Sequence, residues 1–199
     1  MRNFIIPFAE WILNFEDLDI NHKDIHQYLK RLDFVDVEGN LKRPQITTSK
    51  NILDKIPLVK NYFETIVGDG LKEIGYNVNI KIGTSWGTCC RGKIVSEFHN
   101  HANYWISAVY YPAGSENTIQ FKKPNLHTWE IATEKQNPSF TSFTSTDYTK
   151  TNKEGTLLVF PSYLEHRIIN NNDERYSIAM NINPVGEIGT GDSKIVIWY

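Results

Sequence analysis

Residues 94–111 of the chain read IVSEFHNHANYWISAVYY and contain two short runs, 94–101 and 105–111, that are rich in β-branched and aromatic residues. Runs of this kind are typical of strands. Five further runs of the same composition are residues 78–82, 118–121, 156–160, 177–182 and 195–198. Turn-forming clusters separate the runs and no helical crossovers lie between them, so the pattern predicts antiparallel strands in a barrel or a double-sheet jelly roll.

The part of the chain before this β-rich region has a helical pattern. Residues 24–32 and 52–74 carry apolar side chains at helical spacing. Asn21 is the expected N-cap of the first helix, and Gly75 closes the second. Pro57 lies in the first turns of the second stretch and is expected to split it into two pieces.

The length of 199 residues fits one domain with a substantial core. We therefore expect a single α+β domain, mainly β, in which residues 1–75 form a helical N-terminal support and residues 76–199 form the β core. Residues 137–153 are dense in Ser and Thr. They are the most loop-like segment and a candidate lid or substrate loop.

The charges of the chain are nearly balanced, with 21 Lys and Arg against 23 Asp and Glu and a formal net charge of −2. They are interspersed, which argues against nucleic acid or an anionic membrane as a partner. We expect neither a membrane-spanning segment nor a signal peptide. The cysteines, Cys89 and Cys90, are adjacent and poorly placed to bridge each other, so we expect reduced thiols and a cytoplasmic location.

Two histidines of the opening stretch, His99 and His101, could hold a metal ion. On a strand, residues i and i+2 project from one face about 7 Å apart, so two imidazoles can converge on one ion. A third imidazole, His166, follows a predicted strand and a Pro-containing turn and is expected near the start of a new strand. One such pair plus a distant His is the arrangement of a facial metal site with three open positions.

Other interpretations of the same stretch stay open. The two histidines could be surface residues at a strand end. The second ligand could also be another residue of the segment, with Glu97 paired with His99 or His101 paired with Asn103, since these four side chains alternate onto one face.

A second candidate site is Arg175-Tyr176-Ser177, in which Arg175 and Ser177 share a strand face. A guanidinium and a hydroxyl on one side can bind a carboxylate through charge-assisted hydrogen bonds. The alternative is an ordinary ion pair of Arg175 with Asp173 or Glu174, which for this motif alone is the simpler explanation.

The order of the motifs along the chain resembles that of the 2-oxoglutarate/Fe(II)-dependent oxygenase superfamily, and most closely that of its members in tailed phages and marine bacteria. The resemblance covers residues 52–182 and is strongest after Trp86. The matching motifs are Trp86, His99-x-His101, the strand from Ser107 to Tyr110-Tyr111, the segment from Gly155 through Phe160-Pro161-Ser162 to His166, and Arg175-x-Ser177. The step of nine residues from His166 to Arg175 also matches the superfamily.

This resemblance implies a double-stranded β-helix (jelly-roll) core and an Fe(II)- and 2-oxoglutarate-dependent dioxygenase. It would couple oxidative decarboxylation of 2-oxoglutarate to hydroxylation of a C–H bond by O2, in a small molecule or in a peptidyl substrate such as a prolyl residue. The implied Fe(II) ligands are His99, His101 and His166. The implied 2-oxoglutarate contacts are Arg175, Ser177, Tyr111 and Thr88. If a phage encodes the chain, the host cytoplasm is the expected location.

The chain departs from the superfamily at one ligand, because His101 stands where Asp or Glu is usual. A neutral imidazole leaves the charge of the ion uncompensated, which favours an anionic ligand. Two other functions remain open: a three-histidine, cupin-like metal enzyme that does not use 2-oxoglutarate, and a non-catalytic jelly-roll module for binding or structure. Neither the substrate nor the oligomeric state can be deduced from the sequence.

Overall fold

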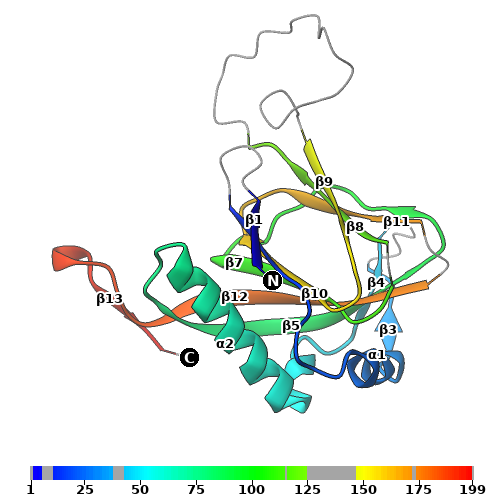
Figure 1. The fold of residues 1–199 in the computed structure, drawn as a ribbon, viewed down its shortest axis with the longest axis horizontal. Helices are drawn as coiled ribbons and strands as arrows, with labels where there is room; N and C mark the ends of the chain where they lie inside the picture. Colours follow the sequence, from blue (N-terminus) through cyan, green and yellow to red (C-terminus); the bar gives the residue numbers. More distant parts are fainter. Residues whose placement is uncertain are drawn as a thin grey trace, which may run out of the picture.

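The computed structural model describes residues 2–5, 11–37, 43–114, 116–124, 147–171 and 174–198. Two antiparallel sheets form the body of the fold in this part of the chain (Figure 1). The order of strands in the larger sheet is β1 (Arg2–Ile5), β2 (Ile12–Phe15), β10 (Thr156–Pro161), β7 (Ile106–Tyr111), β12 (Glu174–Ile188), β5 (Asn79–Arg91), β4 (Gln45–Thr47) and β3 (Phe34–Val35), with β13 (Ile195–Ile197) paired to the end of β12. The smaller sheet has the order β6 (Ile94–Val95), β11 (His166–Asn170), β8 (Asn117–Lys122) and β9 (Asp147–Asn152).

The central strands of the larger sheet are buried on both faces, and their side chains alternate between two apolar clusters. In β10, Leu157 and Val159 belong to the cluster on the helix side, whereas Leu158 and Phe160 belong to the cluster that also contains Ile119 of the smaller sheet. This alternation follows from the period of two along a strand. Two sheets with a shared interior agree with the predicted jelly-roll core.

The helices cover the outer face of the larger sheet. Helix α2 (Pro57–Glu73) crosses β5 and β12 obliquely in the view of Figure 1 and buries Phe63, Val67 and Leu71 in the outer cluster. As predicted, Pro57 separates it from a preceding 3-10 turn, η2 (Ile52–Lys55). After α2, Gly75 adopts a φ of 97°, a conformation that favours glycine.

Helix α1 (His22–Lys30) has the predicted cap, since the Asn21 side chain accepts a hydrogen bond from the Asp24 backbone N–H. A second 3-10 turn, η3 (Gly191–Ser193), precedes β13. In the described ranges, no helix has the length and apolarity that a membrane span requires.

The expected helical support over residues 1–75 contains strands as well as helices, because β1, β2, β3 and β4 also lie there and join the larger sheet. These strands have two to four residues each, too few for a period to appear in the sequence. The predicted loop 137–153 contains β9, and its residues 137–146 lie outside the described part.

Candidate metal centre

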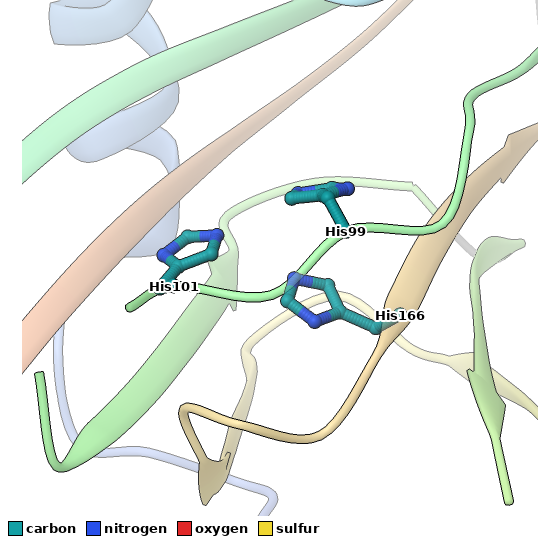
Figure 2. A group of neighbouring side chains, drawn as sticks. All are labelled: His99, His101 and His166. Carbon is teal, nitrogen blue, oxygen red and sulfur yellow. The ribbon is translucent and has the colours of Figure 1, made fainter. Parts of the chain in front are cut away.

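Three imidazoles meet at one end of the space between the two sheets (Figure 2). Their candidate ligand atoms, one each from His99, His101 and His166, all lie within 4.8 Å of one another. Among the residues that the structure describes, these three histidines are the group of His, Cys, Asp or Glu side chains whose ligand atoms lie close enough together to hold one metal ion.

The backbone explains why these rings converge. His166 opens β11, as predicted, and His99 forms an isolated antiparallel bridge with it through N–H···O=C bonds of 3.0 and 2.9 Å. The strand expected over residues 94–101 is regular only in β6. The segment nevertheless stays beside β11, because the Ser96 N–H donates to the Ile168 carbonyl at 3.0 Å. The His101 N–H donates to the Ser162 carbonyl at 2.9 Å, in the turn between β10 and β11. His99 and His101 therefore present nearly parallel rings, 5.4 Å apart between centroids.

Each imidazole has a hydrogen-bond acceptor beside Nδ1. The acceptors are the Glu97 carbonyl at 3.2 Å for His99, the Leu164 carbonyl at 2.9 Å for His166 and the Asn181 Oδ1 at 2.6 Å for His101. Because these oxygens only accept, each Nδ1 carries the proton and donates it, and each Nε2 keeps a lone pair for an ion. This arrangement is typical of metal-binding histidines.

The surroundings keep the rings neutral. Burial is the main cause that lowers the pKa of His99 and His101, and it lowers the pKa of His166 to about 3. At neutral pH the Nε2 lone pairs are therefore not lost to protonation.

The two alternative ligand pairs do not fit this geometry. The Glu97 side chain is 70% exposed and forms an ion pair with Arg43 at 3.4 Å. Asn103 is exposed in a turn, with a φ of 72°. The structure therefore brings His101, rather than either of these residues, to His99 and His166.

The second predicted site lies deeper between the sheets, where β12 pairs with β5. Arg175 is opposite Cys90, and Ser177 is opposite Thr88. The Thr88 and Ser177 hydroxyls share a hydrogen bond of 2.6 Å, and both residues line an inner cavity together with the three histidines. The alternative interpretation, an ion pair of Arg175 with Glu174, is not found in the described chain, because Glu174 pairs with Arg91 at 3.5 Å. The other alternative partner, Asp173, lies outside the described residues.

Arg175 is a buried cation, 3% exposed, with unused donors. Its Nη1 donates to the Thr118 carbonyl at 3.3 Å, but its Nε and Nη2 have no partner among the described residues. The guanidinium lies 4.9 Å from the centre of the Tyr111 ring, and the buried Tyr111 hydroxyl also lacks a partner there. Unpaired buried donors are costly, so the cluster fits an anionic ligand that accepts several hydrogen bonds.

Two supporting residues were not predicted in these roles. Asn181 holds His101, and its own Nδ2 donates to Thr84 Oγ1 at 3.1 Å. Its position, six residues after Arg175 on the same strand face, was the available signal. Trp86, named above only as one of the matching motifs, stacks on His101 with ring centroids 5.5 Å apart and an interplanar angle of 26°.

Comparison with known proteins agrees with this fold. Residues 84–181 match the sequence family described as "Putative 2OG-Fe(II) oxygenase". No curated protein matches the chain with significance. HygX from Streptomyces hygroscopicus, solved with nickel, 2-oxoglutarate and hygromycin B bound, has 12% identity and a TM-score of 0.58, over 87% of this chain and 82% of its own.

Two prolyl hydroxylases have a similar fold. A Pseudomonas putida prolyl-4-hydroxylase has 12% identity and a TM-score of 0.58, covering 89% of this chain and 95% of that one. The viral collagen prolyl hydroxylase of Paramecium Bursaria Chlorella virus-1, solved as its 2OG complex, has 9% identity and a TM-score of 0.53, covering 91% and 99%. At such identities, the likeness concerns the fold.

Proposed function

We propose that this chain is a 2-oxoglutarate/Fe(II)-dependent oxygenase, which couples the oxidative decarboxylation of 2-oxoglutarate to the hydroxylation of a C–H bond. When bound, the ion and 2-oxoglutarate supply the redox chemistry, in which 2-oxoglutarate, O2 and R–H give succinate, CO2 and R–OH. The chain itself supplies ligands, charge and a cavity that excludes water.

In this proposal His99, His101 and His166 hold Fe(II) through Nε2. The distal carboxylate of 2-oxoglutarate accepts hydrogen bonds from Arg175 and from the Tyr111 hydroxyl. The observation that carries the proposal is the pair of unused Arg175 donors beside Tyr111, whose hydroxyl is also unpaired among the described residues. Tyr111 lines the same cavity as the three neutral imidazoles.

The hydroxyls of Thr88 and Ser177 form the polar side of the same cavity and would contact the cosubstrate. Three neutral ligands leave the 2+ charge of the ion uncompensated, and the Arg175 guanidinium adds another positive charge. A dianion that spans the ion and the guanidinium compensates two of these three positive charges. Apolar walls, including Ile119, keep water out and strengthen these attractions.

An anaerobic titration tests the proposal. Fe(II) and 2-oxoglutarate added to the protein should produce the weak visible charge-transfer band of a chelated keto acid. Iron binding without the band would favour a cupin-like enzyme that does not use 2-oxoglutarate. Absence of iron binding would favour a non-catalytic module.

Two variants separate the roles of the ligands. His166→Ala should lose metal binding and succinate formation. Arg175→Ala should keep metal binding and raise the 2-oxoglutarate concentration needed for half-maximal succinate formation about 10- to 100-fold, since it removes charge-assisted hydrogen bonds. Unchanged succinate formation in both variants contradicts the assignment.

The finer parts of the proposal concern the substrate and the setting. We favour a peptidyl substrate such as a prolyl residue, for which the prolyl hydroxylases of similar fold are the support. Mass spectrometry of a proline-containing peptide after turnover should show the addition of one oxygen atom.

A cytoplasmic location, that of the host for a phage-encoded chain, accords with the free, buried thiols of Cys89 and Cys90.

A further inference from the structure

A larger pocket opens next to the inner cavity and shares part of its wall with it. The two have Trp86, Thr88, His99, His101 and Ile168 in common. The outer pocket has a volume of about 410 Å³, which is the size of a small-molecule site. If 2-oxoglutarate occupies the inner cavity, as proposed above, the outer pocket is where a substrate reaches the ion.

The charged residues that line this outer pocket are Arg43, Lys50 and Glu97. Glu97 is engaged by Arg43, so that pair is neutral overall. The Lys50 ammonium has no carboxylate partner among the described residues and lies 5.8 Å from the centre of the Trp86 ring. The pocket therefore carries one uncompensated positive charge besides that of the ion.

The backbone fixes the point from which Lys50 extends. The Ser85 N–H donates to the Lys50 carbonyl at 2.7 Å, and Asn51 forms a bridge with Ser85. Lys50 is thus attached to β5 directly beside Trp86. Because Trp86 also stacks on His101, one indole ring links the ammonium to a candidate metal ligand.

We propose that the substrate carries an oxyanion, a carboxylate or a phosphate, which binds Lys50 while an adjacent apolar group lies against Pro44 and Ile46. Both of these residues line the outer pocket, as do Lys50, His99 and His101. Partial burial lowers the pKa of Lys50, and a bound anion would stabilise its charged form.

This inference rests on the proposed function, and two probes that differ in charge test it. The probes are N-acetyl-L-proline and its neutral carboxamide, titrated calorimetrically and without O2 into protein saturated with Fe(II) and 2-oxoglutarate. We expect the carboxylate to bind at least about tenfold more tightly than the amide. A parallel titration with inorganic phosphate shows whether the site also accepts that oxyanion.

Variants attribute the preference to one side chain. In Lys50→Gln the two probes should bind equally, and in Lys50→Glu the amide should bind more tightly. Lys93→Glu, an equal change at an exposed lysine outside the pocket, should keep the tenfold preference. Melting curves followed by circular dichroism verify that each variant is folded.

The outcomes separate this inference from the proposed function. If wild-type protein forms succinate from 2-oxoglutarate but does not discriminate between the probes, or binds neither, the inference about the oxyanion is wrong and the proposed function stands. The inference is also wrong if Lys50→Glu keeps the preference for the carboxylate. If the wild type neither gives the charge-transfer band nor forms succinate, the proposed function itself fails.

Discussion

At the scale of single residues, His101 differs from the other two histidines in how its ring is held. His99 and His166 donate to main-chain carbonyls, whereas His101 donates to the side chain of Asn181. A side-chain acceptor can be removed by substitution without altering the backbone. The contribution of this acceptor to metal binding can therefore be measured.

Asn181→Leu should weaken binding of Fe(II) or Zn(II) about 10- to 100-fold, because the His101 Nδ1–H loses its acceptor and the ring its fixed orientation. Competition with a chromophoric chelator measures the affinity. Thr84→Val is the matched control, since it removes only the anchor of Asn181. We expect the control to change the affinity by no more than a few-fold. Equal affinities in wild type and Asn181→Leu would show that this hydrogen bond does not position the ligand.

The low pKa of His166 predicts how the stability of the metal-free protein depends on pH. The folded-state pKa is about 3, below the usual 6.5, so between these values the unfolded chain binds a proton that the folded chain does not. The free energy of unfolding should therefore fall with acidity, by roughly 2 kcal/mol from pH 6.5 to 5.0 for this group. Urea unfolding with a chelator present measures it, and His166→Leu should flatten the dependence. A slope unchanged in that variant would assign the effect to other groups.

Much of the candidate site could be anticipated from sequence because its signals are local. His99 and His101 are two residues apart, and so are Arg175 and Ser177, so a period of two suffices to place each pair on one face. Asn181 was missed because its position on the same strand face as Arg175 does not by itself indicate a contact with a histidine. Its role depends on its contact with His101, which the fold brings to it from another part of the chain.

At the scale of elements, the sequence pattern located strands where both faces are apolar, as in β7 and β10. It underestimated β5, which runs for 13 residues rather than five, because Gly, Thr and Ser interrupt the apolar pattern. These small and polar residues include Thr88, which faces the cavity. A residue that lines the cavity thus also interrupts the apolar pattern from which the strand would have been predicted.

Helix α2 packs closely on β2 through Gly70. A Cβ added there would lie 2.6 Å from Phe15 Cζ and 3.1 Å from Leu13 Cδ1, and both side chains are buried. Gly70→Ala should therefore destabilise the protein by about 1–3 kcal/mol despite its better helix propensity. Gly68→Ala, two residues earlier and with its nearest contact at 3.9 Å, should instead stabilise by up to about 1 kcal/mol. Chemical denaturation compares the two, and equal effects would contradict the close packing.

At the scale of the whole molecule, the net charge of −2 does not reveal the charge of the site. Arg175 contributes positive charge beside Tyr111 of the inner cavity, and Lys50 contributes it in the outer pocket. Some carboxylates elsewhere pair with surface lysines and arginines, as Glu64 does with Lys81. Composition reports the sum of the charges, and only the fold determines their distribution.

Binding at the site should stabilise the entire domain. Ligands that bind only the folded state add about 2.7 kcal/mol at 100 times their Kd. For a chain of this size, that corresponds to a rise of roughly 5–10 °C in Tm. Anaerobic thermal scans with Fe(II) and 2-oxoglutarate measure the shift, which a chelator should reverse. His166→Ala should show no such shift, and a rise retained in that variant would place binding elsewhere.

The alternation of side chains along β12 also has an evolutionary consequence. Tyr176, Ile178 and Met180 belong to the outer core, whereas Arg175 and Asn181 face the site. Alternate positions of this strand are therefore constrained mainly by packing in the core, and the positions between them are constrained mainly by the chemistry of the site. Selection can change what the pocket accepts through inward-facing positions while leaving intact the packing that holds the sheet against its helices.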